Sequence, residues 1–153
     1  MRALFLASVT WAAATWAVAL AGCGELDPAI GPDREALPDL CAAGDSDPAT
    51  AVPFAEVRQR VFGQFCGCHT TPGGLGQTVG GLDLDTRDAI LLGGFRSQEN
   101  IVVPGDPCGS ILIQKVGPTP PFGARMPFDG PPFLDAEARR IISDWIAEGA
   151  RDN

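Results

Sequence analysis

The sequence predicts an all-α domain of about four helices, joined by long loops rich in glycine and proline. Two segments carry apolar residues at steps of three and four, the spacing of one face of a helix. Two further segments are bounded by residues that cap helices. No segment shows the regular alternation of a strand, although residues 101–103 could be extended.

The strongest helical pattern lies near the C-terminus. Asp135 is a favourable N-cap, and Gly149 is a favourable stop. Between them, one stripe is formed by Ala138, Ile141, Ile142, Trp145 and Ile146. The pattern predicts a helix that buries one face.

The same reasoning predicts a first helix over residues 53–65. Its apolar face consists of Phe54, Val57, Val61, Phe62 and Phe65. A shorter helix is expected from the N-cap Thr86 through Leu92, where Gly93-Gly94 ends it.

One more helix is expected over residues 108–116. Asp106 would be its N-cap, Pro107 would occupy the first helical position, and Gly117 would end it. The connecting loops are long: residues 70–85 contain five glycines and residues 117–134 contain six prolines. Loops of this length either are flexible or enclose a ligand, and a bound cofactor would supply the apolar centre that four short helices lack.

The N-terminus predicts export. Arg2 is followed by 19 uncharged residues, and the segment Leu20-Ala21-Gly22-Cys23 resembles the end of a bacterial lipoprotein signal. We therefore expect residues 1–22 to be a signal peptide and Cys23 to be the lipidated residue. The protein would then be a lipoprotein of the bacterial cell envelope, on the periplasmic face or the outer membrane, with the membrane as its first partner.

Residues 23–50 are expected to form an acidic, proline-rich linker between the lipid and a domain at 51–153. Between residues 24 and 50 there are seven acidic residues and one arginine. The whole chain has a net charge of −8 and a single lysine, which argues against binding to nucleic acid. Cys41 lies within the linker, which suggests that the linker is bonded to the domain near its end.

Candidate ligands are few. The first helix leads directly into Cys66-Gly67-Cys68-His69, and His69 is the only histidine of the chain. Apart from Met1, the only methionine is Met126, 57 residues further on. An imidazole and a thioether on opposite faces of haem iron are the ligand pair of electron-transfer cytochromes. No hydrolytic metal motif or phosphate-binding loop is present, so an enzyme is not expected.

The order of these features resembles a small c-type cytochrome: a helix, a Cys-His pair, a glycine-rich loop, a proline-rich loop with a methionine, and a final helix. The chain also resembles, over residues 52–151, cytochrome-like domains of exported planctomycete and myxobacterial proteins. The matching segments are Gly-Gly-Leu-Asp-Leu at 80–84, Pro-Gly-Asp-Pro-Cys-Gly-Ser-Ile-Leu at 104–112, Met-Pro at 126–127 and Trp-Ile-Ala-Glu-Gly-Ala at 145–150. The resemblance implies a haem c cofactor, His69 and Met126 as axial ligands, and a protein redox partner.

The attachment motif departs from this family. Haem c is normally bound by Cys-x-x-Cys-His, whereas here one residue separates Cys66 from Cys68. Cys68-His69 keeps the second attachment site and the proximal ligand, while Phe65 stands where the first cysteine is expected. The resemblance therefore implies a single thioether through Cys68, although Cys66 could reach a vinyl group if the chain were locally distorted.

Two other interpretations remain open. In one, the domain has lost haem and is stabilised by two disulfides among Cys41, Cys66, Cys68 and Cys108, in any of three pairings. Such a protein would be a structural or interaction lipoprotein without a cofactor. In the other, Cys66, Cys68 and His69, together with Met126, bind Cu(I).

Overall fold

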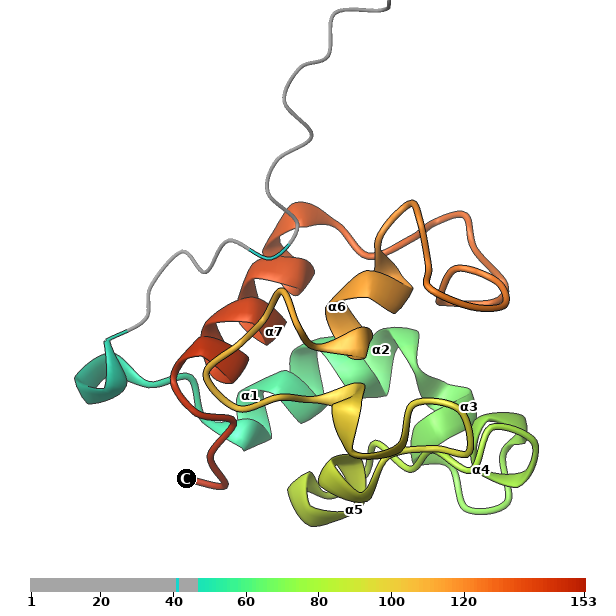
Figure 1. The fold of residues 1–153 in the computed structure, drawn as a ribbon, viewed down its shortest axis with the longest axis horizontal. Helices are drawn as coiled ribbons and strands as arrows, with labels where there is room; N and C mark the ends of the chain where they lie inside the picture. The colour runs from blue at the N-terminus through green and yellow to red at the C-terminus, as the bar shows by residue number, and fades with distance from the viewer. Residues whose placement is uncertain (1–40, 42–46) are drawn as a thin grey trace, which may run out of the picture. The chain divides into compact units, whose positions relative to one another are not determined.

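The computed structural model describes Cys41 and residues 47–153 (Figure 1). The predicted signal peptide 1–22, the lipidation site Cys23 and most of the acidic linker lie outside the described residues. The described residues all belong to one compact unit. Its described part consists of helices, turns and loops without a strand, so the predicted all-α class is confirmed.

The predicted first helix forms one continuous helical segment over residues 54–65. It begins as α1 (Phe54–Val57), widens into a π-helical turn, η2 (Arg58–Phe62), and ends as α2 (Gly63–Phe65). Four of the five residues on its predicted apolar face are buried, and Phe65 packs against the core with part of its surface exposed. The periodic pattern thus identified both the helix and its buried side.

The C-terminal helix α7 (Ala136–Ala147) also agrees with the prediction. The carboxylate of Asp135 accepts a hydrogen bond from the backbone amide of Ala138 at 2.7 Å and so caps the helix. Every residue of the predicted stripe is buried, and Trp145 is 0% exposed. Gly149 follows the end of the helix with a φ of +100°, a conformation that glycine adopts at little cost.

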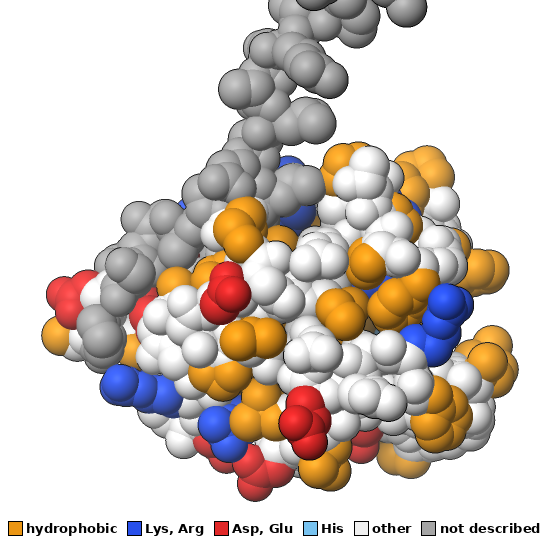
Figure 2. Space-filling model, viewed as in Figure 1, with side chains coloured by type: hydrophobic (Ala, Val, Ile, Leu, Met, Phe, Trp, Pro, Cys, Tyr) orange, Lys and Arg blue, Asp and Glu red, His pale blue; other side chains and the backbone are white. Residues whose placement is uncertain are grey.

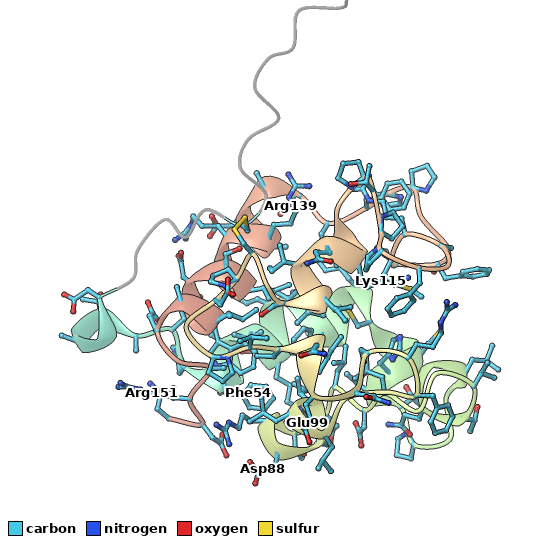
Figure 3. All side chains as sticks on the ribbon, in the orientation of Figure 1. Phe54, Asp88, Glu99, Lys115, Arg139 and Arg151 are labelled. Atoms are coloured by element: carbon cyan, nitrogen blue, oxygen red, sulfur yellow. A yellow bond between two sulfur atoms is a disulfide. The ribbon has the colours of Figure 1, made fainter. Side chains whose placement is uncertain are left out.

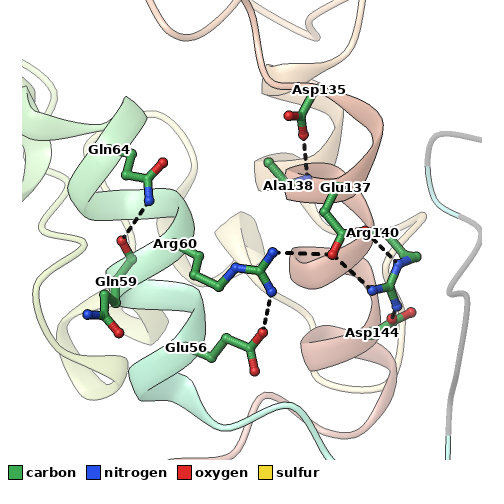
Figure 4. A network of polar contacts seen from close by, with 9 residues as sticks. All are labelled: Glu56, Gln59, Arg60, Gln64, Asp135, Glu137, Ala138, Arg140 and Asp144. Atoms are coloured by element: carbon green, nitrogen blue, oxygen red, sulfur yellow. Dashed lines mark hydrogen bonds and ion pairs between the residues drawn. The ribbon is translucent and has the colours of Figure 1, made fainter.

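The first and last helical segments pack against each other, and apolar contact dominates their interface. The rings of Phe54 and Trp145 lie 5.6 Å apart between centroids. At the edge of this interface, Arg60 contacts Glu56 of its own helix at 2.7 Å and Glu137 of α7 at 3.3 Å (Figure 4). These ion pairs are exposed to solvent and contribute little to stability beside the buried rings.

Two short helices were expected in the middle of the chain, and one of them begins where predicted. The helix α5 (Arg87–Leu92) starts after Thr86, whose hydroxyl accepts a hydrogen bond from Ala89 N at 3.2 Å. Gly93 follows with a φ of +71°. A β-carbon at Gly93 would overlap the backbone of Gln98, so both the conformation and the space require glycine.

The other middle helix begins later than predicted. The helix α6 (Ile111–Val116) starts after Ser110 and not at residue 108. Asp106 does accept a hydrogen bond from an amide, that of Gly109 at 2.8 Å, while the hydroxyl of Ser110 donates to the Asp106 carbonyl at 2.8 Å. These bonds close a separate turn before the helix, and this turn replaces the expected first helical residues.

Several short elements were not predicted. They are η1 (Pro48–Thr50), α3 (Gly67–Thr70), α4 (Leu75–Thr78) and the 3-10 helix η3 (Gln98–Ile101). Each spans about one turn, too short for a periodic pattern to be visible in the sequence. No helix within the described ranges is long and apolar enough to cross a membrane.

The described residues enclose a continuous apolar core, which corrects the expectation that the helices lack an apolar centre of their own. The helices supply most of it, and the connecting segments add Leu84, Val102, Leu134 and Ala150. Sequence patterns had assigned the core to the helical faces alone. The loop residues complete it because the loops fold back across the helices (Figure 1).

Candidate functional site

The Cys-x-Cys-His segment lies at the bend between α2 and α3. Cys66 has φ −121° and ψ 30°, which interrupts the helix at this residue. Its amide still donates to the carbonyl of Phe62 at 2.9 Å, and its carbonyl accepts from the amide of His69 at 2.7 Å. The bend therefore has a defined geometry, and it places His69 in the short helix α3.

The ring of His69 is held in one orientation. Its Nδ1 lies 3.0 Å from the carbonyl oxygen of Leu82. Because a carbonyl only accepts hydrogen bonds, Nδ1 is the nitrogen that donates, which leaves Nε2 as the nitrogen available to a metal. Nε2 has no hydrogen-bond partner among the described residues. This is the arrangement of a histidine that ligates a metal through Nε2.

The glycine-rich loop surrounds the same histidine. The backbone of Gly76 lies flat against the ring, so that a β-carbon there would overlap ring atoms Cγ and Nδ1. The carbonyl of His69 accepts hydrogen bonds from Leu84 N at 3.0 Å and from Gln77 Nε2 at 3.2 Å. Sequence reasoning did not assign a role to Gly76 or Gln77. Only Leu82 belonged to a motif, the Gly-Gly-Leu-Asp-Leu segment at 80–84.

The two cysteines of the segment differ in environment. Cys66 is half-buried and packs against the core, whereas Cys68 is exposed. Burial, and to a smaller extent the neighbouring Cys68, raises the pKa of the Cys66 thiol to about 12. Cys66 therefore stays protonated at neutral pH.

A disulfide joins Cys41 to Cys108 across 67 residues, with the two α-carbons 4.9 Å apart. It attaches Cys41, which lies in the predicted linker, to the turn before α6. Cys66 and Cys68 are free thiols in this structure, so the arrangement with two disulfides among the four cysteines is not present.

Met126 lies in the loop that follows α6. It is partly buried and packs against the same core as Cys66. Its backbone amide donates to the carbonyl of Lys115 at 2.8 Å, which ties this position to the last turn of α6. Residues 117–135 contain no helix or strand, so this contact is one of the few that position Met126.

The donor chemistry fits a haem with axial His and Met ligands. His69 offers an imidazole whose Nε2 has no hydrogen-bond partner among the described residues, Met126 offers a thioether on a separate loop, and the exposed thiol of Cys68 is adjacent to His69. The copper interpretation would use Cys66, Cys68 and His69, with or without Met126. Within the described part of the chain, no three His, Cys, Asp or Glu side chains form a group that could hold a metal ion.

A pocket of about 630 Å³ lies elsewhere, around the end of α5 and the start of η3. It is lined by Gly81, Leu92, Gly93, Gly94, Phe95, Gln98, Glu99 and Asn100. None of the predicted ligands belongs to it. Two of its residues, Leu92 and Phe95, are 78% and 72% exposed, and hydrophobic side chains are also visible on the face shown in Figure 2.

Comparison of the chain with models of protein families, with curated proteins and with solved structures gave no match. The function proposed below therefore rests on the geometry of the site.

Proposed function

We propose that this domain binds one haem and transfers electrons, with His69 and Met126 as the axial ligands. The observation that carries the proposal is the His69 ring, whose Nδ1 is bonded to Leu82 O at 3.0 Å while Nε2 is free. Haem supplies the one-electron chemistry when bound. His69 and Met126 would hold the haem by supplying two ligands to it, which would leave no coordination site for a substrate and favours electron transfer over catalysis.

Cys68 is the proposed point of covalent attachment. Its thiol is exposed and precedes the histidine ligand directly, as the second cysteine of the family motif does. The addition forms a bond between sulfur and a vinyl carbon, and the thiol proton moves to the other vinyl carbon. No oxidant or reductant is consumed. Cys66 is less suited because its thiol is packed against the core.

The domain would act at a membrane surface. Lipidation of Cys23 would anchor it in the cell envelope, and the acidic linker would hold it away from the lipid. The disulfide between Cys41 and Cys108 supports this arrangement, because it needs an oxidising compartment to form. The proposed partner is a redox protein.

A second candidate is a haem-free scaffold. Two observations favour it: the described residues enclose an apolar core of their own, and one disulfide already stabilises the domain. In that case the protein would be a structural or interaction lipoprotein. His69 would serve only to hold the glycine-rich loop in place through its hydrogen bond to the carbonyl of Leu82.

The deciding experiment is expression of the full chain in a bacterium that matures c-type cytochromes, followed by extraction from the membranes. The first candidate requires a coloured protein whose haem resists acid–acetone. Its alkaline pyridine spectrum should lie between those of two-thioether haem and free protohaem, because one vinyl group remains. Cys68→Ser should make the haem extractable, and the matched variant Cys66→Ser should not.

Loss of His69 gives an independent check. His69→Ala should abolish stable haem incorporation, and Met126→Ala should retain the haem but lower its potential, because the sulfur ligand raises it. Colourless wild-type protein from the same host would exclude the haem proposal and leave the scaffold. Colourless protein that contains about one copper per chain would instead support the third interpretation.

A further inference from the structure

Lys115 is the only lysine of the chain, and it is buried. It lies in the last turn of α6 with 8% of its surface exposed. A buried ammonium group is costly unless polar partners replace the lost water. Burial, and to a lesser degree the charge of Arg96, lowers the pKa of Lys115. The polar partners of the Lys115 ammonium must therefore offset the cost of its burial.

The ammonium group and the carbonyl of Lys115 both form hydrogen bonds with the loop that carries Met126. Its Nζ donates to the carbonyl of Phe122 at 2.7 Å and to that of Ala124 at 2.5 Å. Its own carbonyl accepts the amide of Met126 at 2.8 Å. One residue of α6 thus holds three positions of a loop that has no helix or strand of its own. Figure 3 labels Lys115 beside this loop.

Side chains near Lys115 also contact the loop that carries Met126. Arg125 Nε donates to the carbonyl of Val116 at 2.9 Å, and its guanidinium lies 3.9 Å from the ring centre of Phe133. The ring of Phe122 is contacted by Lys115 Nζ at 4.9 Å and by the guanidinium of Arg96 at 4.6 Å. Arg96 touches this ring without a hydrogen bond to the loop backbone, which makes it a useful comparison.

We propose that Lys115 is the positioning residue for Met126: its side chain and carbonyl together hold the thioether where it can reach the iron. This inference rests on the proposed function of the domain. Lysine suits the position because its compact ammonium can donate to two carbonyls in a confined space. The planar guanidinium of arginine needs more room.

The first test measures the loop itself and does not depend on haem. In full-length protein, hydrogen exchange of the amides of residues 117–135 should accelerate at least about tenfold in Lys115→Leu, while the amides of α7 stay protected. Arg96→Leu removes a cation from the same ring but no hydrogen bond, so it should leave the exchange rates close to those of the wild type. Unchanged exchange in Lys115→Leu would overturn the inference.

The second test measures the ligand. In haem-loaded protein, Lys115→Leu should retain haem through His69 and Cys68 but lose most of the ferric thioether-to-iron charge-transfer band, with a lower potential. Lys115→Arg should restore only part of the band, and Arg96→Leu should keep it. A full band in Lys115→Leu would exclude a positioning role. If the wild type is colourless, the proposed function fails, and the exchange measurement alone decides whether Lys115 holds this loop.

Discussion

The ring of His69 and the backbone of Gly76 lie in such close contact that no side chain fits between them. A β-carbon on Gly76 would overlap Cγ and Nδ1 of the ring. One of the overlapped atoms, Nδ1, is the nitrogen that is hydrogen-bonded to Leu82 O. The ring can therefore occupy this position only if residue 76 is glycine.

We therefore predict that Gly76→Ala displaces the His69 ring and breaks its hydrogen bond to Leu82. The loss should destabilise haem-free protein by about 1–3 kcal/mol in denaturant melts, since a partly buried donor is left unpaired. If the haem proposal holds, the variant should also lose haem. Gly67→Ala is the matched control, because a β-carbon there meets nothing within 4 Å. Equal stability of the two variants would show that the ring moves aside freely.

Trp145 should be the most costly single truncation in the core. It is 0% exposed, packs against Phe54, and donates from Nε1 to the Arg151 carbonyl at 2.9 Å. Trp145→Ala should lower the free energy of unfolding by about 3–5 kcal/mol. Phe128→Ala, at a residue that is 79% exposed, should change it by less than about 0.5 kcal/mol. A loss below about 1 kcal/mol for Trp145→Ala would contradict the observed packing.

The two free thiols should react at very different rates in haem-free protein. Only the thiolate is alkylated, and the pKa of Cys66 is raised to about 12 while Cys68 is exposed. Iodoacetamide at neutral pH should therefore modify Cys68 first. Cys66 should become reactive only when the pH is raised toward its pKa or when the protein unfolds. Peptide mass spectrometry after timed quenching would measure both rates. Faster modification of Cys66 would contradict its burial against the core.

The disulfide between Cys41 and Cys108 should stabilise the domain by restricting the unfolded chain. It closes a loop with a sequence separation of 67 residues, and bridges of this kind contribute about 2–4 kcal/mol. Replacing both cysteines by serine should lower the denaturation midpoint accordingly without changing the helical circular dichroism. Adding reductant to the double variant should have no further effect, whereas it should destabilise the wild type. A double variant as stable as the oxidised wild type would show that the bridge has little effect on the unfolded state.

The helices at residues 54–65 and 136–147 could be predicted because their patterns are local. Apolar side chains at steps of three and four mark the face that is buried, and the carboxylate of Asp135 reaches an amide only three residues away. The start of α6 was mispredicted, although its signals were also local. Asp106 does cap a turn there, but the hydroxyl of Ser110 closes that turn before the helix begins.

The sequence by itself determined the helical class, the two principal helices and the small set of residues able to act as ligands. It did so because periodicity, capping and the presence of one histidine can be read along the chain. Only the tertiary structure decided which cysteines pair, which nitrogen of His69 is free and what holds Met126. Each of these depends on groups that are distant in sequence or on an irregular loop: Cys41 and Cys108, His69 and Leu82, Lys115 and the loop of Met126. Such contacts follow from how the loops pack across the core, and no local pattern of residue types encodes that packing.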